Sequence, residues 1–400
     1  MALTEVLLSG GGTAGHLAPG FALRDALAVR GVSSRFVTPG EARERAWFPV
    51  GESEPLHVKA PRLPSRALPA AMFPLQMSGS IVAALAVLRR ERPAAVVALG
   101  GWPCAPTALA AIVAGIPLAL VAVDALPGVV VRRLSPWAGR VYLASDAARA
   151  HLARPEVARV VGPLVRVGAI TGVRDPVRFG LDRGRRTLFV VGGSLGARGL
   201  NRAAVEGLRA AFASEPGLAA RLQVIHSTGP GEQEEVRRAY AAMGLPASVS
   251  PYVQEMGDAL ASADLVLCRG GASTLAEVDA LARPAVVVPY PHHADRQQWR
   301  NAEPLLARGG AVLVEEAALT PSVFRAEVVA RLLDPSALAA MSAAGTRHEP
   351  GRPDGAALAA EDLVRWMKEE GAGSSRAGVR RGSESAPPGA RAAQSLLVRS

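Results

Sequence analysis

Cysteine, lysine and aromatic residues are all scarce in this chain. Cys104 and Cys268 are the only cysteines among 400 residues, and they are far apart in the sequence. A disulfide framework or a structural zinc site needs several cysteines at close spacing, so we expect neither. Lys59 and Lys368 are the only lysines, and aromatic residues make up 4% of the chain. No basic segment is studded with aromatic residues, so we expect no nucleic-acid partner.

The sequence also lacks the signatures of a metal centre and of export. It contains no HExxH or DxD motif, and the pair His292-His293 offers too few ligands for a metal site. The first residues, MALTEVLLSGGG, have no basic region, and their apolar stretch is too short for a signal peptide. We therefore expect a cytoplasmic protein that uses no metal ion and no cofactor.

Small apolar residues are abundant, and their arrangement predicts the fold. Hydrophobic residues make up 49% of the chain, and short apolar strands alternate with helices. The pattern strand, glycine loop, helix occurs at residues 5–30 and restarts at residues 187–201. This alternation predicts an α/β protein with two doubly wound, Rossmann-like domains, whose ligands bind at the carboxyl ends of the strands.

The expected domain limits follow from changes in composition. We expect a first domain over residues 1–165, a second over residues 166–355, and a last helix at 356–370 that packs back on the first domain. Residues 371–400 carry five arginines and one glutamate among Ser, Gly and Pro, which predicts a disordered basic tail. The net charge of +10 is compatible with anionic substrates or an anionic membrane surface.

Residues 102–123 are uncharged and long enough to span a bilayer. Pro103, Pro106, Gly115 and Pro117 interrupt the segment, however. We therefore expect a helix, a turn at Gly115 and a buried strand rather than a transmembrane helix.

Residues 60–90 leave two interpretations open. Arg62 and Arg66 precede a run of apolar side chains: Leu68, Met72, Phe73, Leu75, Met77, Ile81 and Val82. This combination is typical of a shallow membrane contact with arginines facing lipid phosphates, but also of an ordinary buried helix.

Two glycine-rich loops carry the first candidate site residues. The loop at residues 10–16 ends in His16, which is a candidate general base or, alternatively, a structural residue at the helix start. In the second loop, residues 192–197, Ser194 is placed to bind a diphosphate oxygen or to cap the helix, and Asn201 to cap it or face the ligand. No acidic residue follows the second strand near Phe36, which argues against a dinucleotide site.

Two further segments indicate a nucleotide sugar. Residues 264–277 read as a strand, a small-residue turn and a helix that carries Glu277, whose carboxylate can accept hydrogen bonds from ribose hydroxyls. In residues 289–301 a strand ends in a polar cluster, where Asp295 and Gln298, with Gln297, are suited to bind sugar hydroxyls.

With these motifs the chain closely resembles the MurG family of GT-B glycosyltransferases over residues 4–368. Residues 11–16 resemble the family's GGTGGH motif, with Ala14 in place of a glycine, and residues 191–198 resemble its second glycine loop. Residues 268–277 and 295–301 resemble its donor-site signatures. Such enzymes move GlcNAc from UDP-GlcNAc onto undecaprenyl-pyrophosphoryl-MurNAc-pentapeptide, which converts lipid I to lipid II in peptidoglycan synthesis, with inversion at the sugar.

The resemblance implies roles for individual residues. Arg166 and Ser194 would contact the diphosphate or nearby groups. Val253 would offer its backbone to uracil, and Gln297 and Gln298 would hold the GlcNAc. The phosphate and ribose would be held by Ala272, Ser273, Thr274, Leu275, Ala276 and Glu277. The acceptor would bind in the first domain, near Thr13, Ala14, Gly15 and His16. The resemblance further implies a peripheral protein on the cytoplasmic face of the inner membrane.

The first domain departs from the family pattern. Where the family has His-Glu-Gln-Asn, this chain has Val121-Ala122-Val123-Asp124, which makes Asp124 a second candidate base. Trp102 replaces a common Tyr, and Gly162-Pro163-Leu164 replaces Gly-Asn-Pro. Two alternatives therefore stay open: a related UDP-sugar transferase with another lipid or small acceptor, and a donor-binding homologue with weakened catalysis.

Overall fold

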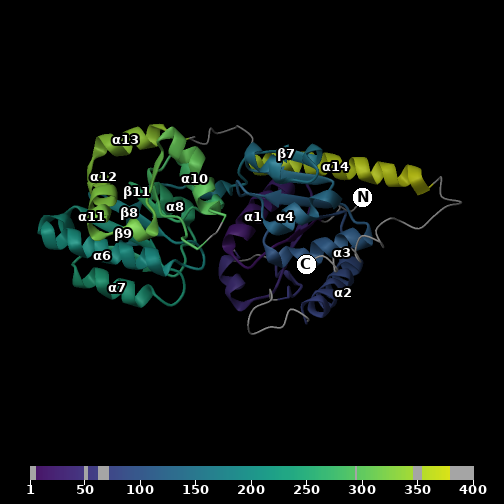
Figure 1. The fold of residues 1–400 in the computed structure, drawn as a ribbon, viewed down its shortest axis with the longest axis horizontal. Coiled ribbons are helices and arrows are strands. Elements are labelled where there is room, and N and C mark those ends of the chain that lie inside the picture. Colours follow the sequence, from purple (N-terminus) through teal and green to yellow (C-terminus); the bar gives the residue numbers. More distant parts are fainter. Residues whose placement is uncertain (1–5, 49–52, 62–71, 293–294, 346–353, 379–400) are drawn as a thin grey trace. The chain divides into compact units, whose positions relative to one another are not determined.

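The computed structural model describes residues 6–48, 53–61, 72–292, 295–345 and 354–378 (Figure 1). The chain divides into two compact units. The first unit comprises Met1–Val123, Pro127–Leu164 and Pro353–Ser400, and the second comprises Asp124–Leu126 and Val165–Arg352. Each unit is built around one parallel β-sheet.

The sheet of the first unit has seven strands in the order β3-β2-β1-β4-β5-β6-β7. Its strands are β1 (Val6–Ser9), β2 (Ser34–Thr38), β3 (Leu56–His57), β4 (Ala95–Ala98), β5 (Leu118–Ala122), β6 (Arg140–Leu143) and β7 (Ala158–Val160). Every residue of β1, β4 and β5 is buried, because helices cover both faces of the sheet.

The helices of this unit include α1 (Ala14–Val29), α2 (Phe73–Glu91), α3 (Ala105–Ala114), α4 (Val129–Leu134) and α14 (Gly355–Gly378). The 3-10 turns are η1 (Ala42–Trp47), η3 (Trp102–Cys104), η4 (Ser135–Trp137), η5 (Asp146–His151) and η6 (Pro155–Val157). The segment 102–123 forms η3, α3 and β5, which confirms the expected helix, turn and strand. Among the residues that the structure describes, no helix is both long and apolar enough to cross a bilayer.

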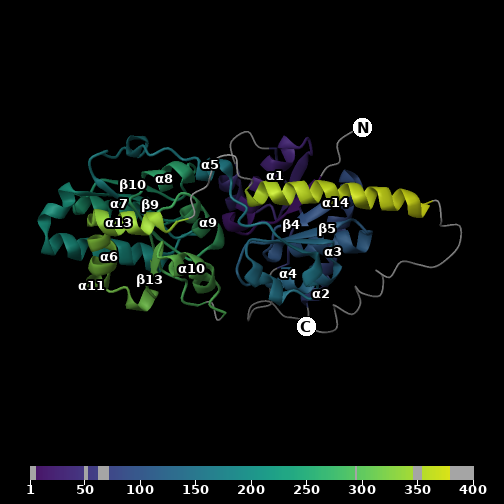
Figure 2. The same cartoon turned by 90° about the horizontal axis from the view of Figure 1, so that it is seen from above.

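Helix α14 lies along the first unit and packs against α1 (Figures 1 and 2). It continues past Glu370, where we expected the helix to end, as far as Gly378. The Trp366 ring lies so close to Gly139 that an added Cβ there would be 2.2 Å from it. Asp362 accepts hydrogen bonds from Arg140 Nε at 3.0 Å and from the Tyr142 hydroxyl at 3.1 Å. The rest of the expected tail, residues 379–400, lies outside the described residues.

The second unit contains a six-stranded sheet in the order β10-β9-β8-β11-β12-β13. Its strands are β8 (Arg186–Val191), β9 (Leu222–Ser227), β10 (Ala247–Ser250), β11 (Leu265–Cys268), β12 (Ala285–Val287) and β13 (Ala311–Leu313). The helices are α5 (Val167–Ile170), α6 (Arg198–Ser214), α7 (Gln233–Ala242), α8 (Met256–Ser262), α9 (Ala272–Ala280), α10 (Gln297–Arg308), α11 (Pro321–Phe324), α12 (Ala330–Leu333) and α13 (Pro335–Ala343). Two parallel, doubly wound sheets confirm the predicted fold class.

Candidate active site

The topology of each sheet predicts where a ligand binds. In the first sheet the strand order reverses between β1 and β4, and in the second it reverses between β8 and β11. Open α/β sheets bind ligands outside the carboxyl ends of the strands at such a switch point. The two glycine loops follow β1 and β8 directly, so each loop lies at the switch point of its own sheet.

On the donor side, α9 begins after a turn of small residues that follows β11. Gly271 precedes the helix, and Ala272, Ser273 and Thr274 form its partly exposed first turn. Leu275 is 5% exposed and packs inward, whereas Ala276 and Glu277 are partly buried. The N–H groups of the first turn of a helix favour negative charge, as a diphosphate would provide.

Glu277 shares its surroundings with Arg166 and Tyr252. Loss of hydration raises the pKa of the Glu277 carboxyl group from 4.5 to about 7, and the positive charge of Arg166 opposes this rise. Burial also raises the pKa of Tyr252, with a further contribution from the charge of Glu277. Arg166 directly precedes α5, which packs on α9 through Ala169 and Ile170. The charges of Glu277 and Arg166 therefore act on each other and on the Tyr252 phenol.

The second glycine loop is supported from inside the domain. Tyr240, His226 and Asn201 form a buried chain of hydrogen bonds, with Tyr240 Oη 2.8 Å from His226 Nδ1 and His226 Nε2 3.0 Å from Asn201 Oδ1. Asn201 Nδ2 in turn donates to the Thr228 carbonyl oxygen at 2.8 Å and to Glu232 at 2.6 Å. Burial lowers the pKa of His226 to about 3, so its imidazole is neutral.

This chain of hydrogen bonds decides how Asn201 acts. Asn201 is 2% exposed, and both polar atoms of its amide have partners inside the domain. An added Cβ on Gly196 would lie 2.2 Å from the Thr228 carbonyl oxygen, so the loop rests directly on the group that Asn201 holds. We therefore interpret Asn201 as a support for the loop. Ser194, within the loop, is partly buried.

The loops after β11 and β12 are joined by Gln298. Its Oε1 accepts the N–H groups of Gly270 at 3.2 Å and of Tyr290 at 2.8 Å. Gln297 is partly buried, and its N–H donates to the exposed Asp295 at 3.2 Å. His293 and Ala294 lie outside the described residues.

Asp124 and Val253 complete the candidates that the structure places in the second unit. The segment Asp124–Leu126 groups with this unit, and the Asp124 carboxylate accepts a hydrogen bond from Asn301 Nδ2 at 2.9 Å. Val253 is 5% exposed and follows β10 in the same loop as Tyr252. The proposed contact of Val253 with uracil and the role of Asp124 as a base stay predictions.

The first glycine loop brings Thr13 and His16 together. Thr13 directly precedes α1, and its Oγ1 lies 2.9 Å from His16 Nδ1. An added Cβ on Gly101 would lie 2.8 Å from the same nitrogen, so Gly101 packs directly against the ring. The imidazole is thus held between the loop after β1 and the loop after β4, while Ala14 is partly buried and Gly15 is exposed.

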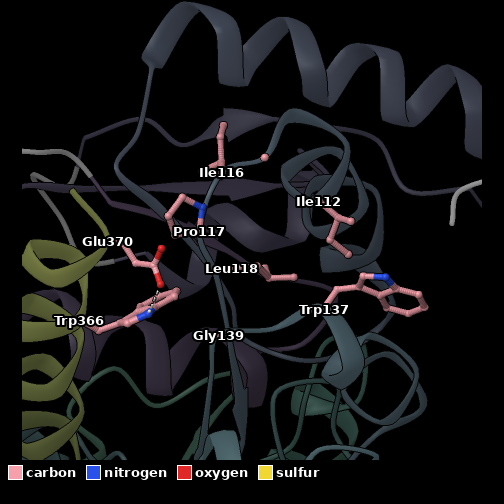
Figure 3. Close-up of a pocket in the computed structure, with 9 residues that line it drawn as sticks. Ile112, Ile116, Pro117, Leu118, Trp137, Gly139, Trp366 and Glu370 are labelled. Atoms are coloured by element: carbon pink, nitrogen blue, oxygen red, sulfur yellow. Dashed lines mark hydrogen bonds between the residues drawn. The ribbon is translucent and has the colours of Figure 1, made fainter. Parts of the chain in front are cut away.

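A separate cavity of about 410 Å³ lies at the end of the first sheet that is opposite to the first glycine loop (Figure 3). Trp366 and Glu370 of α14 line one side, where the indole N–H donates to the Glu370 carboxylate at 3.2 Å, and Leu118 and Trp137 also line the cavity. Leu118 is the first residue of β5, so this cavity faces the amino ends of the strands. Among the described residues there is no group of three or more His, Cys, Asp or Glu arranged to hold a metal ion.

Comparison with known proteins identifies the family. The glycosyltransferase family 28 N-terminal domain matches residues 6–143, and the family 28 C-terminal domain matches residues 187–354. The chain belongs to glycosyltransferase family 28. A family member from Acidovorax sp. (strain JS42) is 38% identical over 320 residues, which cover 78% of this chain and 76% of that protein. A member from Streptomyces avermitilis is 35% identical over 386 residues, covering 92% of this chain and 98% of that protein.

Both relatives are named UDP-N-acetylglucosamine–N-acetylmuramyl-(pentapeptide) pyrophosphoryl-undecaprenol N-acetylglucosamine transferase, so the predicted resemblance to MurG is confirmed. The crystal structure of Acinetobacter baumannii MurG has the same fold, with a TM-score of 0.63 and 24% identity. The match covers 92% of this chain and 99% of the Acinetobacter baumannii chain. The UDP-GlcNAc 2-epimerase of Neisseria meningitidis, solved with UDP-GlcNAc bound, shares the fold at a TM-score of 0.60 and 13% identity, over 90% of this chain and 99% of its own.

Two residues near the glycine loops and Glu277 were missed in the sequence. Tyr252 adjoins Val253, and the charges of Glu277 and Arg166 both affect its pKa. An aromatic residue just after a strand end was a signal that the sequence already contained. Glu44 is buried against the first glycine loop, to whose Gly12 N–H it is hydrogen-bonded. Glu44 is the third residue of η1, where its carboxylate accepts the Glu41 N–H as in a capping box, but this local pattern does not predict its contact with Gly12.

Proposed function

We propose that the chain transfers GlcNAc from UDP-GlcNAc to the lipid-linked MurNAc-pentapeptide and so converts lipid I to lipid II. The observation that carries this proposal is the start of α9 directly after β11, at the switch point of the second sheet, with Glu277 on that helix and the charge of Arg166 acting on its carboxyl group. A carboxylate suits ribose hydroxyls and a guanidinium suits a diphosphate. The names of the family members supply the sugar and the acceptor.

The proposed reaction is a single displacement with inversion. An acceptor hydroxyl oxygen forms a bond to the anomeric carbon, while the bond from that carbon to the diphosphate oxygen breaks and UDP leaves. His16 accepts the hydroxyl proton, since its ring is fixed by Thr13 and packs against Gly101. The negative charge that develops on the leaving diphosphate is stabilised by Arg166 and by the N–H groups at the start of α9.

Labelled UDP-GlcNAc incubated with the lipid-linked MurNAc-pentapeptide tests the proposal directly. We expect label in the lipid fraction, and none when the acceptor is omitted. Transfer to a different lipid or to a small acceptor would instead assign a related UDP-sugar transferase, which the Val121–Asp124 departure leaves open. Tight donor binding without any transfer would assign a donor-binding homologue.

We further propose that the first unit contacts the membrane surface through α2. This helix buries Met77, Ala84 and Leu88 but leaves Leu75 74% and Val82 65% exposed. Arg89 and Arg90 are exposed at its last turn and can face anionic lipid. Of the apolar run in the sequence, Leu68 and the preceding Arg62 and Arg66 lie outside the described residues.

Vesicle flotation tests the membrane contact. We expect the full chain to float with vesicles that contain anionic lipid, and Leu75→Asp together with Val82→Asp to abolish flotation. Val29→Asp is the matched control, because Val29 is 86% exposed but lies on α1. Equal losses in the two variants would contradict a specific role of α2.

A further inference from the structure

Glu44 is a buried carboxylate whose hydrogen bonds go to backbone N–H groups. Its side chain belongs to η1, and the residue is 2% exposed. Oε1 accepts the N–H of Gly12 at 2.9 Å, and Oε2 accepts the N–H groups of Gly40 and Glu41, each at 3.1 Å. One side chain thus joins the loop after β1 to the loop after β2.

The first glycine loop is packed tightly around this carboxylate. Gly11 and Gly12 have φ values of +136° and +78°, a region that favours glycine. An added Cβ on Gly11 would lie 2.6 Å from Glu44 Oε1, and one on Gly12 would lie 3.1 Å from Pro103 Cγ. The loop therefore packs against both Glu44 and Pro103.

This arrangement changes what the first loop can do. A glycine loop before a helix commonly offers its N–H groups to a phosphate. Here the Gly12 N–H is already bound to a carboxylate of the protein itself, and a charge-assisted hydrogen bond of this kind is short and strong. The next residue is Thr13, whose hydroxyl is hydrogen-bonded to the His16 ring. Fixing Gly12 therefore fixes Thr13 and, through it, the imidazole.

We propose that Glu44 is a positioning residue that holds the first glycine loop, and through Thr13 the His16 ring, in the geometry needed for transfer. Glu44 acts through the backbone and does not contact the substrate. This inference rests on the proposed function, because His16 is the base only if the protein is a transferase. It further assigns the Gly12 N–H to positioning rather than to a phosphate.

Glu44→Gln is the most informative substitution, because an amide has the same shape but only one oxygen. It can accept either from Gly12 or from Gly40 and Glu41, and its NH₂ group must then face an N–H on the other side. We expect kcat for transfer to fall about 10- to 100-fold, the scale of a misplacement near 1 Å at a reacting group. The Kd for UDP-GlcNAc should be unchanged, because the donor residues lie in the second unit.

Two further variants separate positioning from general damage. Glu44→Asp keeps the charge on a shorter side chain, so it should recover part of the lost kcat. Glu91→Gln is the matched control, since Glu91 is a largely buried carboxylate of the same unit that pairs with Arg35 and Arg90. It should leave kcat unchanged, and a loss equal to that of Glu44→Gln would overturn the proposal.

Hydrogen exchange and histidine NMR signals test the same link without turnover. In Glu44→Gln the Gly12 amide should exchange faster and the His16 imidazole signals should shift, while amides of the second unit keep their protection. Unchanged Gly12 exchange and His16 signals would overturn the proposal, as would faster exchange with undiminished kcat. If the unmodified chain transfers no sugar, the proposed function fails, and these two readouts still decide whether Glu44 holds His16.

Discussion

The two glycine loops occupy the same place in their sheets, but they are built differently. The first loop is held by a charged group, since Glu44 accepts the Gly12 N–H at 2.9 Å. The second loop rests on the Thr228 carbonyl oxygen, which is held by a buried chain of three uncharged side chains, Tyr240, His226 and Asn201. Asn201 also donates to the Glu232 carboxylate. Gly11 and Gly12 are closely packed, whereas Gly193, with φ of +89°, has no atom within 4 Å of an added Cβ.

From this difference we infer that one sequence signature serves two tasks. The first loop is filled by the protein's own carboxylate, and its rigidity fixes Thr13 and His16. The second loop has an open side at Gly193, where a ligand can approach the backbone. The comparison therefore predicts that substitutions at the first loop lower the rate of transfer. Substitutions at the second loop and the donor site of the second unit should instead lower donor affinity.

The largest expected effect comes from His16→Ala. Loss of a general base lowers a rate by roughly 10²- to 10⁴-fold, so kcat should fall by that factor. The Kd for UDP-GlcNAc, measured by calorimetry, should be unchanged. His151→Ala, an exposed histidine on η5 of the same unit, is the control and should keep full activity. If His16→Ala lost donor binding, the proposed difference between the loops, with the first acting on rate and the second on donor affinity, would be wrong.

Glu277→Ala should act on donor affinity instead. Hydrogen bonds to a charged group contribute about 1.5–3 kcal/mol, so the Kd for UDP-GlcNAc should rise roughly 10- to 100-fold. The unmodified protein should bind a donor with 2′-deoxyribose more weakly than UDP-GlcNAc. Glu277→Ala should bind the two donors equally, because it has already lost the hydrogen bond between Glu277 and the ribose hydroxyl. Glu303→Ala, an exposed carboxylate on α10, should change neither value.

The pH dependence of donor binding should follow Glu277. Burial raises the pKa of its carboxyl group from 4.5 to about 7, so the free protein holds a proton there below neutral pH. Ribose hydroxyls donate to the ionised form, so binding releases this proton, and affinity falls as pH drops through 7. Between pH 8 and pH 6 the Kd should rise roughly tenfold. Glu277→Gln should bind UDP-GlcNAc weakly at both pH values. If its Kd still rose tenfold between pH 8 and pH 6, the pH dependence would belong to another group.

The sequence predicted those parts of the fold and site that depend on local pattern. Apolar strands followed by glycines are visible within a few residues, so β1, β8 and both loops were found, as was the strand that leads to Glu277. Asn201 shows how a small boundary error matters. The helix was expected from residue 201, but α6 begins at Arg198. That start puts position 201 on the same helix face as Ala204, Leu208 and Ala211, a spacing that the sequence already contained.

Other features depend on contacts between distant segments. Glu44 lies 32 residues from Gly12 in the chain, and only the pairing of β1 with β2 brings their loops together. Arg45 of η1 is also charged but exposed, so no periodicity in the sequence predicts that Glu44 is buried. The grouping of Asp124–Leu126 with the second unit is likewise set by tertiary contacts, because the strand before it belongs to the first sheet.

The smallest expected effect tests the neutral support of the second loop. Tyr240→Phe removes the hydroxyl that is hydrogen-bonded to His226 Nδ1 at 2.8 Å and leaves this buried nitrogen without that partner. The free energy of unfolding, measured with denaturant, should fall by about 1–3 kcal/mol. Donor affinity should weaken only slightly, because the His226–Asn201 hydrogen bond is still present.

Tyr142→Phe provides the matched control for this substitution. Tyr142 is equally buried, but its hydroxyl donates to Asp362 in the first unit. It should cost a similar free energy of unfolding and leave donor affinity unchanged, because the second loop does not depend on it. If Tyr142→Phe weakened donor binding as much as Tyr240→Phe did, the effect would reflect general stability. The neutral chain beneath the second loop would then have no specific part in holding the donor.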